Sequence, residues 1–240
     1  MTRNDDVTEV FAELASDYEA TMDRELGSLW GLKYHEFVSG LMATGAVQQG
    51  DAVLDVATGT ALIPRMFQRE VGPRGRLVGL DITPGMLHQA RDRALSAPSF
   101  ASIHLVCASA MSIPFAEGSF DAAICGFGTH HMDVSQLLSE LKRVLKAGGR
   151  LLLADAVAPD YWRRAGMDSL IRNLALLGQR VLDGTRGHLE LEAIWNLRTI
   201  GEWYKALSAL GFIEITLTQH RARRPWYPAA VLFQAAVSGS

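Results

Sequence analysis

Apolar residues follow two different spacings along this chain, and the spacing changes near residue 50. Between Val7 and Met22 they recur three and four positions apart, which predicts one amphipathic helix over that range, and a second helix is expected over residues 29–42. From residue 52 onward, short apolar runs alternate with segments of helical periodicity. Strands are predicted over residues 52–56, 76–80, 103–107, 121–125 and 150–154, and helices over residues 61–69, 84–94 and 134–145.

The later part of the chain breaks this alternation. Residues 161–182 have the pattern of an inserted helical segment, and Thr199–Leu210 predicts a further helix that ends at Gly211. Two final strands, over residues 212–217 and 229–234, are expected to form an antiparallel hairpin. Strands that alternate with helices form a parallel sheet covered on both faces, because the crossovers between them are right-handed. We therefore expect an α/β fold with a seven-stranded, mostly parallel sheet and a C-terminal antiparallel hairpin.

The length of 240 residues predicts a single domain. Its parts are expected to be N-terminal lid helices over residues 1–48, a ligand-binding core over 49–157, a helical cap over 158–198, and a C-terminal helix and hairpin over 199–240.

Composition and charge exclude several classes of protein. With 48% hydrophobic residues and a net charge of −3, the chain fits a soluble globular protein and not a general nucleic-acid binder. The basic cluster of Arg221, Arg223 and Arg224 is expected to be a solvated turn in preference to a nucleic-acid contact. No apolar run reaches the roughly 18 residues of a membrane span, and the polar start is unlike a signal peptide, so we expect a cytoplasmic protein.

Two cysteines, Cys107 and Cys125, lie in predicted strands and are expected to be buried free thiols. No spacing of Cys and His indicates a metal site, so no metal is expected.

A turn of small residues follows the first predicted strand. Val53–Ala61 reads VLDVATGTA, and small side chains allow backbone to approach a ligand closely. A helix N-terminus comes next and favours electron-rich groups. The turn has one glycine where the dinucleotide motif G-x-G-x-x-G has three, which disfavours a nicotinamide cofactor.

Two further anchors follow later strands. Asp81 ends the second strand, where a carboxylate can accept both hydroxyls of a ribose; the alternative is an exposed Asp that only caps the strand end. After the third strand, Ala108–Met111 provides small residues and the Ser109 hydroxyl, which suit the edge of an adenine ring.

Taken in order, these segments resemble class I S-adenosylmethionine-dependent methyltransferases. The resemblance is closest to the ubiquinone/menaquinone biosynthesis C-methyltransferase family and to small-molecule, natural-product methyltransferases. It is carried by VFAELASDYE at residues 10–19, VLDVATGT at 53–60, VGLDITPGML at 78–87, FD at 120–121 and RVLKAGGR at 143–150. It implies a Rossmann-like sheet and S-adenosyl-L-methionine as the cofactor, released as S-adenosyl-L-homocysteine.

The resemblance also implies which residues bind this cofactor. They are Tyr18, Asp55, Ala57, Thr58, Gly59, Thr60, Asp81, Ile82, Met86, Ser109, Ala110, Met111, Gly126 and Phe127. Tyr18 belongs to a lid helix, the turn around Gly59 lines the methionine portion, Asp81 binds the ribose, and Ser109 and Ala110 face the adenine.

The chain departs from the family pattern at four places. Ala61 stands where the family usually has glycine, and Ser109 where relatives often have Asp or Asn. His130-His131 replaces the Arg-Asn pair that quinone-pathway enzymes commonly carry, and the chain from residue 160 on does not match theirs. The last two departures are on the substrate side, which argues against the quinone precursor as the acceptor.

His130, His131 and Asp155 are the candidate catalytic residues. The two histidines follow the fourth strand, and Asp155 ends the fifth, which should be its neighbour in the sheet. An Asp that orients a His makes a competent general base, and relatives that methylate hydroxyls have a similar pair. We therefore expect His130 to be the base and Asp155 its partner, with His131 as the second candidate; the alternative is that the histidines pack and cap the next helix.

We expect methyl transfer to an oxygen or carbon of a small, largely apolar acceptor, in secondary or specialised metabolism. Two alternatives stay open: the same fold catalysing a non-methylating cyclisation or rearrangement, and a non-catalytic cofactor-binding module. The acceptor should be bound by the lid helices and by residues 161–195, which contain Trp162 and Trp195. The expected partners are the small-molecule acceptor and, through an apolar stripe over residues 170–181, a second copy of the chain; nucleic acid is not expected.

Overall fold

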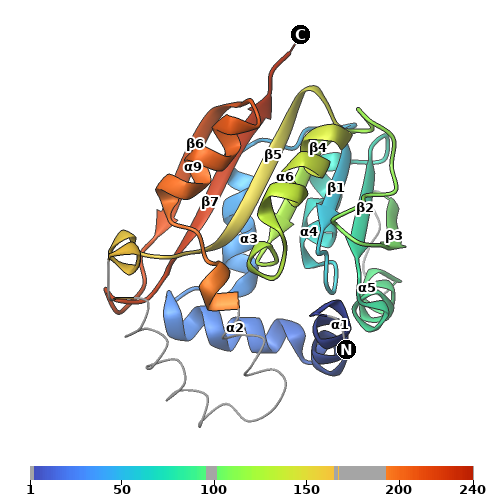
Figure 1. Ribbon diagram of the computed structural model, residues 1–240. Helices are drawn as coiled ribbons and strands as arrows, with labels where there is room; N and C mark the ends of the chain where they lie inside the picture. The colour runs from blue at the N-terminus through green and yellow to red at the C-terminus, as the bar shows by residue number, and fades with distance from the viewer. Residues whose placement is uncertain (1–2, 96–101, 165–166, 168–192, 240) are drawn as a thin grey trace.

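A seven-stranded sheet forms the centre of the protein (Figure 1). The computed structural model describes residues 3–95, 102–164, 167 and 193–239. The strands are β1 (Ala52–Val56), β2 (Arg76–Asp81), β3 (Ser102–Cys107), β4 (Phe120–Gly126), β5 (Leu145–Val157), β6 (Phe212–His220) and β7 (Ala229–Val237). Their order is β3-β2-β1-β4-β5-β7-β6; β1 to β5 pair in parallel, and β7 is antiparallel to both its neighbours. The predicted parallel sheet and C-terminal hairpin are confirmed.

The direction of the chain through the sheet reverses between β1 and β4. From β1 the chain proceeds outward to β2 and β3, and it then returns to β4 and proceeds the other way to β5. β1 and β4 are paired in register, with Val56 opposite Cys125. Loops that leave neighbouring strands in opposite directions open a crevice at their carboxyl ends, which is where such sheets bind ligands.

Helices cover both faces of the sheet. They are α1 (Arg3–Leu14), α2 (Tyr18–Leu29), α3 (Tyr34–Ala43), α4 (Leu62–Val71), α5 (Pro84–Leu95), α6 (Val134–Val144) and α9 (Ile200–Ala209), with 3-10 turns η1 (Thr129–His131) and η2 (Asp160–Arg163). One apolar layer packs α6 and α9 against the sheet, and another packs α3 and α4 against its opposite face. α1 and α2 lie across the edge where the parallel strands end (Figure 1).

The predicted helix over residues 7–22 is wrong in one respect, because the structure divides it into α1 and α2. The backbone N–H of Ala15 donates to the carbonyl of Ala12, and that of Asp17 to Leu14, three residues back in each case. These tighter bonds interrupt the helical ladder. The break brings the rings of Phe11 and Tyr18 within 6.3 Å of each other at the crevice. The second predicted helix begins later than expected, at Tyr34.

Two other expectations are corrected. The strand predicted over residues 150–154 begins earlier, because α6 stops at Val144 and β5 starts at Leu145, so Gly148 and Gly149 lie inside the strand. Gly148 adopts a φ of +72° beside a register shift between β4 and β5, so the glycines form an irregularity inside the strand. Cys107 is exposed, because β3 is an edge strand, whereas Cys125 is buried as predicted. Most of the predicted insert over residues 161–182 lies outside the described residues.

Candidate active site

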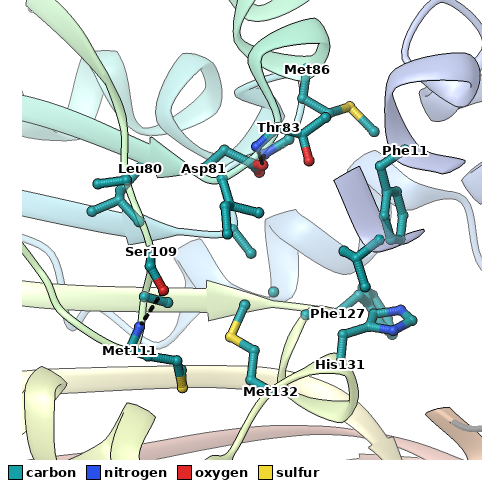
Figure 2. Close-up of a pocket in the computed structure, with 18 of the residues that line it drawn as sticks. Phe11, Leu80, Asp81, Thr83, Met86, Ser109, Met111, Phe127, His131 and Met132 are labelled. Atoms are coloured by element: carbon teal, nitrogen blue, oxygen red, sulfur yellow. Dashed lines mark hydrogen bonds between the residues drawn. The ribbon is translucent and has the colours of Figure 1, made fainter. Parts of the chain in front are cut away.

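A cavity of about 230 Å³ lies at the carboxyl ends of β1, β2 and β4, beneath α1 and α2. We call it the strand-end cavity. Of the predicted cofactor residues, those that line it are Tyr18, Ala57, Gly59, Asp81, Ile82, Met86, Ser109, Ala110, Met111, Gly126 and Phe127. Figure 2 shows side chains from separate elements facing this space, with Asp81 and Ser109 on one side and Phe11 and His131 on another. The topology therefore brings together residues that are far apart in sequence.

Three predicted residues are not in the cavity wall. Asp55 and Thr58 are buried behind the turn, and the hydroxyl of Thr60 donates to Glu19 of α2 at 2.7 Å. Their side chains support the turn from behind. Sequence reasoning missed Val7, Phe11, Leu80, Thr83, Gly128, Met132, Asp133 and Gln136 as lining residues. The apolar ones among them look like ordinary core or helix-face residues in the sequence.

The turn after β1 has an unusual backbone. Ala57, Gly59 and Ala61 all adopt a φ between +54° and +57°, the left-handed region that favours glycine. A Cβ added at Gly128 would lie 2.8 Å from the Cβ of Ala57, which is too close for two carbon atoms. The methyl group of Ala57 therefore leaves room only for glycine at position 128. Ala61, which stands where the family usually has glycine, therefore keeps the backbone conformation of glycine.

We expect Ala57→Gly and Ala61→Gly each to raise the free energy of unfolding by about 1 kcal/mol, because glycine relieves the left-handed strain of an alanine. Chemical denaturation measures this. Ala123→Gly, in the buried centre of β4, is the matched control and should lower stability by about 1 kcal/mol or more. Destabilisation by both turn substitutions would mean that the turn does not store this strain.

Asp81 holds the turn by its backbone. One carboxyl oxygen accepts the N–H of Gly59 at 2.8 Å, and the other accepts the N–H of Thr83 at 2.9 Å. Burial raises the pKa of Asp81, and the backbone hydrogen bonds from Thr83 and Gly59 oppose that rise. The hydroxyl of Thr83 and the N–H of Ile82 also hydrogen-bond to this carboxylate, so donors of the turn and of the segment after β2 face it together.

Asp55 is buried beneath the turn. Its Oδ2 accepts the hydroxyl of Thr58 at 2.5 Å, while its Oδ1 has no hydrogen-bond partner within the described chain. Burial raises the pKa of Asp55 to about 8; the Thr58 hydrogen bond opposes the rise, and the charge of Asp81 adds to it. A buried carboxyl oxygen without a donor is rare in folded proteins, and this one lies behind the turn and not in the cavity wall.

The raised pKa of Asp55 predicts how stability depends on pH. Folding favours the protonated form, so the stability that Asp55 contributes is fully present below its unfolded pKa near 3.8 and declines as pH rises toward 8. Asp55→Asn, which carries no charge, should therefore raise the melting temperature of the ligand-free protein more at about pH 8.5 than at about pH 5.5. Equal gains at both pH values, measured by calorimetry, would show that Asp55 is not the titrating group.

Glu19 ties α2 to the core. Its Oε1 accepts the Thr60 hydroxyl and forms ion pairs with Arg65 of α4 and Arg93 of α5. The helix that covers the cavity is thus connected directly to the turn after β1. Glu19 lies in the VFAELASDYE segment, but its spacing gave no sign of this role.

A second cavity, of about 250 Å³, adjoins the first. We call it the apolar cavity, because most of its wall comes from aliphatic and aromatic side chains of the lid helices and the C-terminal part of the chain. Its lining includes Leu14, Met22, Leu26, Leu29, Trp30, Ala156, Ala193, Ile194, Leu197, Tyr227 and Pro228. Phe11, Tyr18, Phe127 and His131 line both cavities, so they form the boundary between the two. Trp162 and Trp203 pack in apolar clusters and do not line either cavity.

His130 and Asp155 meet at the wall of the apolar cavity. Nδ1 of His130 lies 2.7 Å from Oδ1 of Asp155, and Asp155 also accepts hydrogen bonds from Thr129 and from the backbone of Ala156. Burial would raise the pKa of Asp155, but the charge and hydrogen bond of His130, with the bonds from Thr129 and Ala156, hold it below its ordinary value. The arrangement is an ionised carboxylate that fixes the orientation of an imidazole.

His131 has a different environment. Its ring contacts Phe11 edge-on at 5.4 Å between centroids, and it lines both cavities.

Within the described ranges, no group of three or more His, Cys, Asp and Glu residues could hold a metal ion. Nor does any helix of the described part combine the length and apolarity that crossing a bilayer requires.

Sheet order, the turn after β1 and the acid after β2 define the class of the protein: a Rossmann-like, S-adenosylmethionine-dependent methyltransferase. The sequence model of the ubiE/COQ5 methyltransferase family matches residues 1–162. The chain belongs to this family.

Named relatives agree with this assignment. The chain is 34% identical over 154 residues to a demethylmenaquinone methyltransferase of Symbiobacterium thermophilum, a match that covers 64% of this chain and 60% of that protein. A demethylmenaquinone methyltransferase of Listeria monocytogenes is 34% identical over 68% of each chain. The crystal structure of the [4+2]-cyclase SpnF superposes with a TM-score of 0.69 over 98% of this chain and 96% of its own; at 16% identity this likeness shows the fold alone.

Proposed function

We propose that the protein transfers the methyl group of S-adenosylmethionine to an oxygen or ring carbon of a small, largely apolar acceptor that carries an acidic hydroxyl. The observation that carries this proposal is the 2.7 Å contact of His130 with Asp155 at the wall of an apolar cavity that adjoins the strand-end cavity. A base at this position would lie on the side where an acceptor would bind.

The residues of the strand-end cavity fit the cofactor. Asp81 lines the cavity, and its carboxylate would accept hydroxyls of the ribose, while Asp55 would support the turn from behind. Ser109, whose hydroxyl accepts the N–H of Met111 at 3.2 Å, would border the adenine together with Ala110. When bound, S-adenosylmethionine supplies a sulfonium-activated methyl group.

His130 would act as a general base. With Nδ1 engaged by Asp155, Nε2 is the nitrogen that would accept a proton, and the carboxylate would stabilise the imidazolium that forms. Removing the proton of a phenol makes both its oxygen and the ring carbon beside it nucleophilic. One base can therefore serve methylation at the oxygen or at the ring carbon. The apolar walls of the cavity would keep water away from either reacting atom.

The names of the relatives and the aromatic lining of the apolar cavity both bear on which acceptor to test first. The His130-His131 pair argued against a quinone precursor, but several relatives are named demethylmenaquinone methyltransferases. These names favour a reduced, dihydroxy aromatic ring as the first acceptor to test, ahead of a specialised metabolite. Aromatic side chains such as Trp30, Phe127 and Tyr227 would pack against such a ring.

Incubation with methyl-labelled S-adenosylmethionine and a panel of phenols and reduced naphthoquinones tests the proposal. We expect label in the acceptor and a product heavier by one methylene unit, with the methylated atom identified by NMR. Acceptor that rearranges without gaining label would indicate a cyclase. Cofactor binding without any turnover across the panel would favour a binding module.

A further inference from the structure

The loop that joins β6 to β7, residues 221–228, carries an exposed group of basic and aromatic side chains. Arg221, Arg223 and Arg224 are all exposed, and the loop contains no acidic residue. Trp226 has 61% of its surface exposed and Tyr227 has 37%. Large apolar side chains are rarely exposed in this number on one short loop unless the surface has a partner.

The backbone of this loop is held in place by other elements. The N–H of Arg223 donates to Leu29 O at 2.8 Å, Trp30 Nε1 donates to Pro228 O at 2.9 Å, and the Tyr161 hydroxyl donates to Trp226 O at 2.9 Å. None of these bonds uses the Trp226 side chain. The indole is therefore presented outward from a fixed loop.

Charges next to the loop leave it basic. The neighbouring turn η2 contributes Asp160 and Arg163, and Arg164 follows it; Arg163 is paired with Glu202 at 2.8 Å. Apart from the Arg163–Glu202 pair, the charged side chains of the loop and of residues 160–164 have a positive net charge, although the whole chain has a net charge of −3.

The loop is also continuous with the apolar cavity. Tyr227 and Pro228 line that cavity, while Trp226, the residue before them, faces solvent. Residues of the cavity wall thus follow the exposed indole directly in the chain, and the Arg224 guanidinium lies 5.7 Å from the centre of the Tyr227 ring.

We propose that loop 221–228 docks the protein onto an anionic lipid bilayer. Guanidinium groups pair with lipid phosphates, and Trp and Tyr settle at the level of the headgroups, so this combination fits a bilayer surface. A second copy of the chain fits less well, because a symmetric contact would place arginines against arginines. The docked loop would put the apolar cavity beside the lipid; only this link to acceptor delivery rests on the proposed function.

Vesicle sedimentation tests the docking without any measurement of activity. At low salt we expect the protein to bind phosphatidylcholine vesicles that contain about one third phosphatidylglycerol and not vesicles of phosphatidylcholine alone. Arg221→Glu with Arg224→Glu should weaken binding by roughly 30-fold or more, from about tenfold per 1.4 kcal/mol and about 1 kcal/mol per arginine. Trp226→Ser should weaken it by roughly tenfold.

The matched control is Arg74→Glu with Arg91→Glu. It makes the same change in net charge at exposed arginines beside β2 and on α5, toward the opposite edge of the sheet from β6. It should weaken binding less than about threefold. No binding to anionic vesicles, or an equal loss in the control, would overturn the proposal. So would a dimer in lipid-free solution that Trp226→Ser dissociates, because a second copy would then cover the loop.

Discussion

His130→Ala is expected to lower kcat by roughly 10²–10⁴-fold, the contribution typical of a positioned general base. The 2.7 Å contact with Asp155 fixes the ring, so Asp155→Asn should lower kcat in the same direction, because an amide cannot stabilise the imidazolium. Initial rates at saturating cofactor and acceptor measure both effects. The double variant should be little slower than His130→Ala, because the two residues act as one unit.

His131→Ala is the matched control on the same 3-10 turn. Because His131 packs against Phe11 between the two cavities, its loss should raise KM more than it lowers kcat. A near-normal kcat for His130→Ala, with the large loss in His131→Ala, would transfer the catalytic role to the second histidine.

Asp81→Ala should weaken the binding of S-adenosylmethionine by about 1–3 kcal/mol, or roughly 5- to 150-fold in Kd. The carboxylate offers acceptors to the ribose, and it also accepts the N–H groups of Gly59 and Thr83 that shape the turn. Removing it therefore lowers folding stability as well, and affinity must be measured well below the melting temperature. Asp81→Asn, which keeps one acceptor oxygen, should have an intermediate affinity.

Asp121→Ala separates binding from stability. Asp121 lies at the start of β4, away from the cavity, where it accepts the N–H of Ala52 and pairs with Lys146. Its loss should reduce stability and leave cofactor affinity unchanged. Unchanged affinity in a folded Asp81→Ala variant would instead remove Asp81 from the site.

The sequence predicts the core of this fold well because its signals there are local. β1 was predicted with its observed ends, and the two final predicted strands form the antiparallel pair β6 and β7. The predictions fail where a tertiary contact overrides the local pattern. The apolar spacing continues across Ala15–Asp17, yet the chain bends there, and Glu19 fastens the second helix over the turn.

The site divides in the same way. Gly59 and Asp81 were found because parallel strands bring their ends to one edge, and the His130–Asp155 pair followed from the neighbouring positions of β4 and β5. Other features depend on the directions of side chains and on the packing of the N-terminal helices. They are the support of the turn from behind by Asp55, Thr58 and Thr60, and the position of Phe11 in the walls of both cavities. Periodicity alone does not encode these.

Titration calorimetry of the purified chain with S-adenosylmethionine and S-adenosylhomocysteine tests the central claim most directly, which is that the crevice between β1 and β4 holds this nucleoside. We predict saturable binding of one molecule per chain, weakened by Asp81→Ala and unchanged by Asp121→Ala. Absence of saturable binding of either compound at concentrations up to about 1 mM, where even a binding free energy of about −4 kcal/mol would be detected, would contradict the account.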